Sequence, residues 1–94
     1  MAAQRFEWNA EKAQSNFTTH GVRFEEAVTV FRDSLSVSIP DPDHSQGEHR
    51  YIELGASTLG RLLVVSYTER ADVIRIIGAR RATRKEVRDY EQGI

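Results

Sequence analysis

The spacing of hydrophobic residues changes along the chain, and the change predicts both helices and strands. Between residues 24 and 32, apolar residues recur at intervals of three and four, as on the buried face of an amphipathic helix; they are Phe24, Ala27, Val28 and Phe31. Residues 35–39 instead alternate between apolar and polar, which is typical of a half-buried strand. Residues 62–65 are all apolar, which indicates a strand that is covered on both faces.

Capping and turn residues divide this pattern into separate elements. Asn9 is suited to cap a helix over residues 10–20, and Gly21 is suited to follow that helix in the left-handed conformation. Further helices are expected over residues 24–32 and 84–93, and strands over residues 5–8, 35–39, 49–56, 61–68 and 73–79. Because short connections join the last four strands, these strands are expected to pair antiparallel.

The order of the elements predicts the fold class. It is α+β, an antiparallel β-meander with two N-terminal helices and one C-terminal helix. The strand over residues 61–68 is expected at the centre of the sheet, with the strand over residues 73–79 beside it.

Length and composition limit the kind of protein. A chain of 94 residues is expected to form a single domain, residues 1–94, around one modest core. It shows neither a membrane-spanning run nor a signal-peptide pattern, so we expect a cytoplasmic protein that does not contact a membrane. The absence of cysteine excludes disulfides, a thiol nucleophile and a thiolate metal site. Neither a phosphate-binding loop nor a dinucleotide or zinc signature is present, so no cofactor and no metal are expected.

The charges are segregated although the net charge is only −1. Most cations of the C-terminal part lie close together in sequence; they are Arg75, Arg80, Arg81, Arg84, Lys85 and Arg88. Arg84 and Arg88 would be neighbours on one helical face, where like charges repel, so the stability of the helix does not explain them. A polyanionic partner would explain them, whereas a merely solvated face is the alternative.

Two groups of residues are suited to chemistry on a phosphate. Lys12, Asn16 and His20 are spaced by four and share one helical face. His20 is a candidate general acid or base, because histidine titrates near neutrality, although an imidazole at a helix end can also serve only as a cap. Arg75 lies in an apolar strand, where a charge needs a partner, and together with Arg80 it could hold a scissile phosphate.

Three further candidates have both a structural and a functional interpretation. Thr83 and Glu86 match a capping box, which competes with a catalytic role for Glu86. Tyr90 on the same helix is either catalytic or a tether for the end of the chain. Trp8, just before a helix cap, is either a packing residue or a stacking platform for a base.

These residues and their order resemble the BrnT family. The N-terminal half of the likeness consists of Phe6-Glu7-Trp8, Lys12, Asn16, His20-Gly21, Phe24-Glu25-Glu26-Ala27 and Phe31. The C-terminal half consists of Gly60-Arg61-Leu62-Leu63, Thr68-Glu69-Arg70, Ile74 to Arg80, Ala82, Thr83, Arg84, Glu86 and Tyr90. The resemblance implies a ribonuclease toxin of a type II toxin–antitoxin pair with a RelE-like fold.

The resemblance also implies partners. These are an RNA substrate and a cognate BrnA-like antitoxin with a ribbon-helix-helix DNA-binding domain, which would hold the toxin inactive and carry it to the operator DNA. We expect an acidic or amphipathic segment of this antitoxin to cover the arginines. The chain departs from the usual family pattern at Gly78, where Ser is common, and at Arg23, where Ser or Thr would cap the second helix.

The expected reaction is metal-independent RNA cleavage, in which the ribose 2′-OH attacks the adjacent phosphate. Residues expected to take part in catalysis are Arg80 for the phosphate charge, Arg75 and Lys12 in support, His20 and then Tyr90 as acid or base, and Glu86. Residues expected to bind the RNA are Trp8, Arg81, Arg84 and Arg88. The second hypothesis is a non-catalytic module that binds nucleic acid or docks an antitoxin through the same basic surface.

Overall fold

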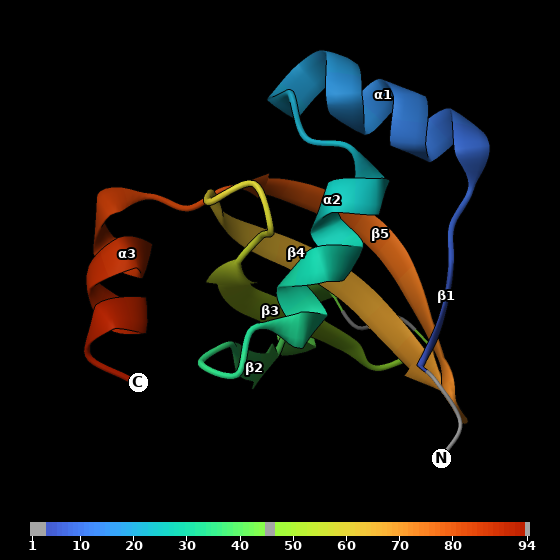
Figure 1. The fold of residues 1–94 in the computed structure, drawn as a ribbon. Coiled ribbons are helices and arrows are strands. Elements are labelled where there is room, and N and C mark those ends of the chain that lie inside the picture. The colour runs from blue at the N-terminus through green and yellow to red at the C-terminus, as the bar shows by residue number, and fades with distance from the viewer. Residues whose placement is uncertain (1–3, 45–46, 94) are drawn as a thin grey trace.

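The computed structural model describes residues 4–44 and 47–93. Along the chain the elements are β1 (Arg5–Glu7), α1 (Ala10–His20), α2 (Phe24–Thr29), the 3₁₀ turn η1 (Val30–Arg32), β2 (Val37–Pro40), the 3₁₀ turn η2 (Pro42–His44), β3 (Arg50–Ala56), β4 (Leu62–Arg70), β5 (Val73–Arg81) and α3 (Arg84–Glu91), as Figure 1 shows. The predicted order of helices and strands is confirmed. The helix expected over residues 24–32 is divided into α2 and η1.

The strands form one sheet in the order β1-β5-β4-β3-β2. Strands β2 to β5 pair antiparallel in sequence, so the predicted meander is confirmed, with β4 central and β5 beside it. The sheet as a whole is mixed, because β1 pairs parallel to β5. A parallel pair needs a long connection, and here the chain passes through both N-terminal helices and the strands β2, β3 and β4 between β1 and β5.

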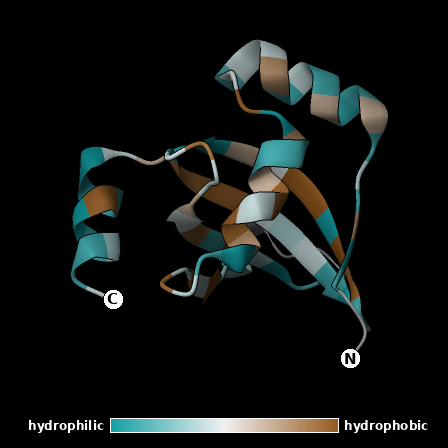
Figure 2. Cartoon of the chain, in the orientation of Figure 1, coloured by the Kyte–Doolittle hydropathy of each residue, from teal (hydrophilic) through white to brown (hydrophobic). Residues whose placement is uncertain are grey.

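Helix α2 packs across one face of the sheet, which we call the covered face (Figure 1). Phe24 and Ala27 of α2 are fully buried against Leu63 and Val65 of β4. Hydrophobic residues gather on the strands behind α2, whereas α3 is mainly hydrophilic (Figure 2). Val64, between Leu63 and Val65, is also buried, so this run is apolar on both faces as expected.

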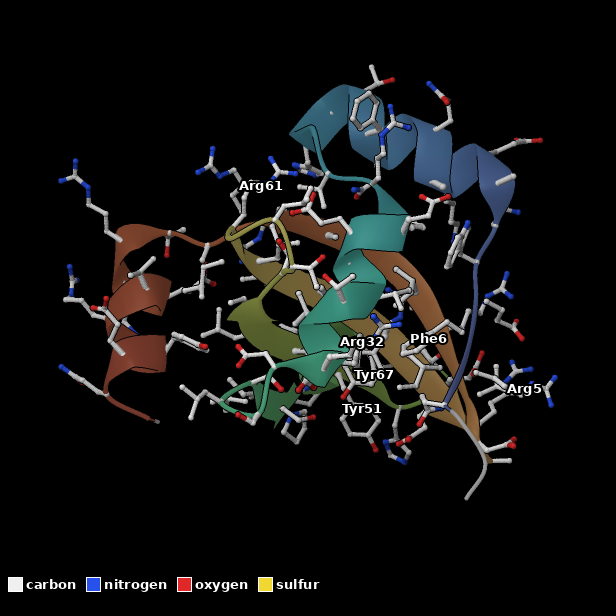
Figure 3. All side chains as sticks on the ribbon, viewed as in Figure 1. Arg5, Phe6, Arg32, Tyr51, Arg61 and Tyr67 are labelled. Carbon is white, nitrogen blue, oxygen red and sulfur yellow. The ribbon has the colours of Figure 1, made fainter. Side chains whose placement is uncertain are left out.

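An aromatic cluster extends the core toward the far end of α2 (Figure 3). The ring of Phe31 lies 5.2 Å from that of Phe6 and 5.0 Å from that of Tyr67, measured between centroids. Tyr51 stacks on Tyr67 at 5.6 Å. These rings join η1 to β1, β3 and β4. No helix in the described residues is long and apolar enough to span a membrane.

The Asn16 side chain attaches helix α1 to the edge of β5 by hydrogen bonds. β1 pairs with β5 only along Val73–Arg75, so the outer edge of β5 would otherwise be open at Ala79. Asn16 donates to the Ala79 carbonyl at 2.9 Å and accepts from the Ala79 amide at 3.1 Å. Its amide group therefore replaces the peptide group of a missing neighbouring strand. Asn16 also donates to the Val22 carbonyl at 3.0 Å, which fixes the connection to α2.

The caps predicted for α1 are present, and α2 has no side-chain cap at its start, as expected. Asn9 accepts from the Lys12 amide at 3.0 Å, and Gly21 follows α1 with φ of 69°. Arg23 precedes α2 without a side-chain cap, as its lack of an acceptor group predicts.

Candidate active site

The face of the sheet opposite α2, which we call the open face, carries apolar and polar side chains in rows. The strand register aligns Ile52, Ser66 and Gly78 in one row across β3, β4 and β5. It aligns Leu54, Val64 and Arg80 in the next row. The two rows share a face because they are two residues apart on each strand, and a bulge between Ser66 and Tyr67 shifts the register with β5 only beyond them.

A cavity of about 300 Å³ lies on this face and brings together residues from distant parts of the chain. Its lining includes His20 from α1, Arg50 from β3, Ser66 from β4, and Gly78 and Arg80 from β5. His20 and Arg80, both predicted to take part in catalysis, therefore line the same cavity. Since Asn16 fixes α1 beside Ala79, the same contact determines where His20 lies.

Arg80 is held by the first turn of α3. Its Nη1 and Nη2 atoms donate to the two carboxylate oxygens of Glu86, each at 2.9 Å. Glu86 also accepts from the Thr83 amide at 2.8 Å, while the Thr83 hydroxyl accepts from the Glu86 amide at 3.2 Å. The capping box predicted from the sequence is therefore present, and its glutamate has a second role as the partner of Arg80.

This arrangement fixes the charges of both groups. The hydrogen bonds from Arg80 are the main cause that lowers the pKa of Glu86 to about 2. The same interaction raises the pKa of Arg80. Glu86 is therefore ionised at neutral pH and is a weak proton acceptor, which favours a positioning role over acid–base catalysis.

Lys12 lies beside this site without lining the main cavity. A smaller cavity of about 220 Å³ is lined by Lys12, Asn16 and His20, together with Ile77 of β5. The polar face of α1, which the spacing of these residues predicted, therefore lines a groove along β5.

Tyr90 and Trp8 point elsewhere. The Tyr90 hydroxyl donates to Asp33 Oδ2 at 2.5 Å, and this hydrogen bond is the main cause that raises the pKa of Tyr90. The ring of Trp8 packs edge-on against Phe24 at 6.0 Å. These contacts match the structural interpretations, a tether and a packing residue, so catalysis by Tyr90 and base stacking by Trp8 stay predictions without geometric support.

The other predicted cations divide between the two faces. Arg75 lies in the open-face row of Thr68 and forms an ion pair with Glu7 of β1, which supplies the partner that an arginine in an apolar strand needs. Arg81 pairs in register with Leu63, a covered-face residue, so it lies on the opposite side from Arg80. Arg84 and Arg88 are exposed on α3.

Sequence reasoning missed Arg50 and Ser66 as site residues. The alternation in β3 does place Arg50 on the same face as Ile52 and Leu54. It does not show which residues of the neighbouring strands lie beside Arg50 on that face. The register of β3 with β4 is what brings Arg50 into the cavity.

Comparison with known proteins identifies the family. A family model described as the ribonuclease toxin BrnT of a type II toxin–antitoxin system matches residues 8–86. The chain belongs to the BrnT family. BrnT toxins are ribonucleases, so the hypothesis of an enzyme, an endoribonuclease, is confirmed over that of a non-catalytic module.

A solved structure has the same fold. The crystal structure of the Brucella abortus ribonuclease toxin BrnT superimposes with a TM-score of 0.68 at 16% sequence identity, covering 87% of this chain and 100% of that chain. Comparison with curated proteins gives no match.

Proposed function

We propose that this BrnT-family toxin cleaves RNA without a metal ion, by attack of the ribose 2′-OH on the adjacent phosphate. The reaction needs a base for the 2′-OH, an acid for the leaving 5′-oxygen and a cation for the charge that develops on the phosphate. The observation that carries the proposal is that His20 and Arg80 line one cavity. In this mechanism His20 takes the proton from the 2′-OH and then gives it to the leaving 5′-oxygen, and Arg80 binds the phosphate.

The hydrogen bonds of Arg80 leave room for a phosphate. Nη1 and Nη2 bind Glu86, and Nη1 also donates to the Arg81 carbonyl at 3.3 Å. A guanidinium has five N–H donors, so the edge formed by Nε and Nη2 can still donate to two phosphate oxygens. Glu86 holds the guanidinium in place from the other edge, which restricts its motion before the RNA arrives.

The surrounding cations are proposed to bind the RNA backbone. Lys12 lies along the groove that contains His20, whereas Arg84 and Arg88 belong to α3, the helix that holds Arg80 through Glu86. Backbone contacts of this kind add affinity without selecting a sequence.

The test is a set of purified variants assayed on RNA in EDTA. Arg80→Ala should lower the rate at least about a hundredfold, which corresponds to roughly 3 kcal/mol of transition-state stabilisation. His20→Ala should also lower the rate strongly. Arg81→Ala is the matched control, because Arg81 is the next residue and lies on the other face. Products should carry 2′,3′-cyclic phosphate ends.

Two results would contradict the mechanism. One is cleavage that requires added magnesium. The other is near wild-type cleavage by both Arg80→Ala and His20→Ala.

We further propose that a BrnA-like antitoxin with a ribbon-helix-helix domain covers the site and provides the only contact with operator DNA. A type II system supplies an antitoxin partner, and Arg80, Arg84 and Arg88 favour an acidic segment by charge complementarity. In a co-purified complex, hydrogen exchange should slow at the end of β5 and in α3. Slowing confined to residues 41–44, with β5 and α3 unchanged, would contradict this proposal.

A further inference from the structure

A second pair of charged residues lies at the far end of the main cavity. Asp41 and Arg50 both line it, together with Arg80. The Asp41 amide donates to the Arg50 carbonyl at 2.8 Å, one position beyond the last pair of the β2–β3 ladder, Pro40 with Tyr51. Because Ile39 pairs with Ile52 on the open face, the next alternate positions, Asp41 and Arg50, are cross-strand neighbours on that same face.

The two ends of the cavity differ in charge. The Arg80 end holds a cation whose counter-ion, Glu86, approaches from outside the cavity. The other end contains the Asp41 carboxylate beside the Arg50 guanidinium, so it offers hydrogen-bond acceptors and donors together. Between them the lining includes the apolar Ile52, Val64 and Ile77 beside Ser66, and the apolar part of this surface suits a planar ring.

We propose that Asp41 and Arg50 recognise a guanine base next to the cleaved bond, which rests on the proposed function of Arg80 as the phosphate ligand. Guanine offers the O6 and N7 acceptor pair that arginine prefers to bind with two hydrogen bonds. It also presents the N1–H and 2-amino donors that a carboxylate accepts. Single-stranded RNA is commonly read in this way, through the exposed edges of unstacked bases.

The dimensions of the sheet fit one nucleotide between the two ends. Arg50 pairs with Thr68 and Arg80 with Val64, so the two arginines are offset by four positions along β4. At about 3.3 Å per residue this offset is roughly 13 Å along the strand, and the two strand spacings between β3 and β5 add about 10 Å across the sheet, which gives roughly 16 Å between the backbone positions. Both side chains extend into the same cavity and shorten this span.

The experiment measures cleavage of short RNA oligonucleotides that differ at one base. The wild-type chain should cut the guanosine substrate about tenfold to a hundredfold faster than those with adenosine, cytidine or uridine. Inosine, which lacks the 2-amino group, tests the contact with Asp41. 7-Deazaguanosine, which lacks N7, tests the contact with Arg50.

The variants assign each contact. Asp41→Asn should reduce the guanosine-to-inosine rate ratio, and Arg50→Gln should reduce the guanosine-to-7-deazaguanosine ratio. Arg32→Ala, an arginine that does not line the cavity, is the matched control and should keep both ratios. Each ratio compares two substrates with the same preparation, so a partial loss of folded protein does not affect it.

The outcomes separate this inference from the proposed function. Equal cleavage of all four oligonucleotides, or a guanosine preference that survives both Asp41→Asn and Arg50→Gln, overturns the guanine site alone. A preference for another base also overturns it. If Arg80→Ala cuts every substrate at the wild-type rate, the phosphate-binding role of Arg80 fails, and the guanine site fails with it.

Discussion

Two arginine–glutamate pairs, one on each face of the sheet, lie in different surroundings. On the covered face Arg61 binds Glu26 of α2, whose side chain is only 5% exposed. On the open face Arg80 binds Glu86, whose side chain is 27% exposed. The same two residue types thus form one pair inside the fold and one at the edge of the candidate active site.

The buried pair joins three parts of the chain. Glu26 accepts from Arg61 Nε at 3.0 Å and from the Ser57 hydroxyl at 2.7 Å. Arg61 also donates to the Gly21 carbonyl at 3.1 Å, so the pair connects the β3–β4 turn with α2 and the end of α1. In Figure 3 Arg61 lies at the opposite end of α2 from Tyr51 and Tyr67. The hydrogen bond from Arg61 is the main cause that lowers the pKa of Glu26.

The two pairs differ in whether water can solvate the glutamate when its arginine partner is removed. Both carboxylate oxygens of Glu26 accept hydrogen bonds within the fold. If Arg61 is lost, the Glu26 carboxylate stays buried without its counter-ion. Glu86 can be rehydrated, and Arg80 keeps a free edge toward the cavity. The covered pair should therefore control folding, whereas the open pair should control activity.

Removing Arg61 should have the largest effect on stability. Arg61→Ala leaves the Glu26 carboxylate buried without its counter-ion and should lower the free energy of unfolding by about 3 kcal/mol. The rate of RNA cleavage per folded molecule should stay close to wild type. Urea unfolding followed by circular dichroism measures the first quantity. If Arg80→Ala loses as much stability as Arg61→Ala, the covered pair does not control folding more than the open pair does.

Removing the Asn16 amide should affect both properties. Asn16→Ala leaves the amide and carbonyl of Ala79 without their partner and should cost about 2 kcal/mol of stability. It also releases α1, which carries His20, so cleavage should fall further than the stability loss explains. Hydrogen exchange of the Ala79 amide should accelerate. Gln14→Ala, an exposed substitution on the same helix, is the control and should change neither exchange nor cleavage.

Glu86 gives the open pair a defined pH dependence. Its pKa is about 2 in the folded chain, below its usual value of 4.5, so it stabilises the fold above pH 4.5 and this contribution is lost as the pH falls toward 2. Glu86→Gln should be less stable than wild type at pH 7, by about 1 kcal/mol, because the pair is partly exposed. Thermal unfolding should show that this difference disappears near pH 2. A difference that stays constant from pH 7 to pH 2 would show that the charge of Glu86 is not involved.

The sequence predicted the fold well because local signals and topology agreed. Short turns required antiparallel pairing, and the apolar run over residues 62–65 required a central strand; both expectations hold in β4 and its neighbours. The parallel pairing of β1 was not predicted, because a three-residue strand carries no signal for its partner.

The candidate site was only partly predictable. The spacing in α1 placed Lys12 and His20 on one face, and the capping box identified Glu86, but each of these signals is local. The role of Glu86 as the partner of Arg80 depends on how α3 turns back toward β5, and Arg50 enters the cavity through a strand register. Such contacts between elements depend on how the elements pack, and a single sequence contains no local pattern that predicts them.

Two glycines, Gly55 and Gly78, show how tightly each face is packed at one position. A Cβ atom on Gly55 would lie 2.8 Å from Ser36 Cβ and 2.9 Å from Val30 Cγ1, on the covered face. A Cβ atom on Gly78 would have only Asn16 Oδ1 near it, at 3.7 Å, on the open face. There is therefore no space for a methyl group at Gly55 on the covered face, whereas there is space for one at Gly78 on the open face.

Gly78→Ala should accordingly produce a small gain in stability. Alanine in a strand interior is favoured over glycine by roughly 0.5–1 kcal/mol, and no clash opposes it at Gly78. Gly55→Ala is the matched substitution and should instead lose about 1–3 kcal/mol through overpacking. Urea unfolding of the two variants measures both changes. Because Gly78 lines the cavity, its new methyl group should also lower RNA cleavage slightly by narrowing the space beside Arg80. If both alanine variants lost stability equally, the open face would be as tightly packed as the covered one, and the cavity beside Arg80 would be too small to admit RNA.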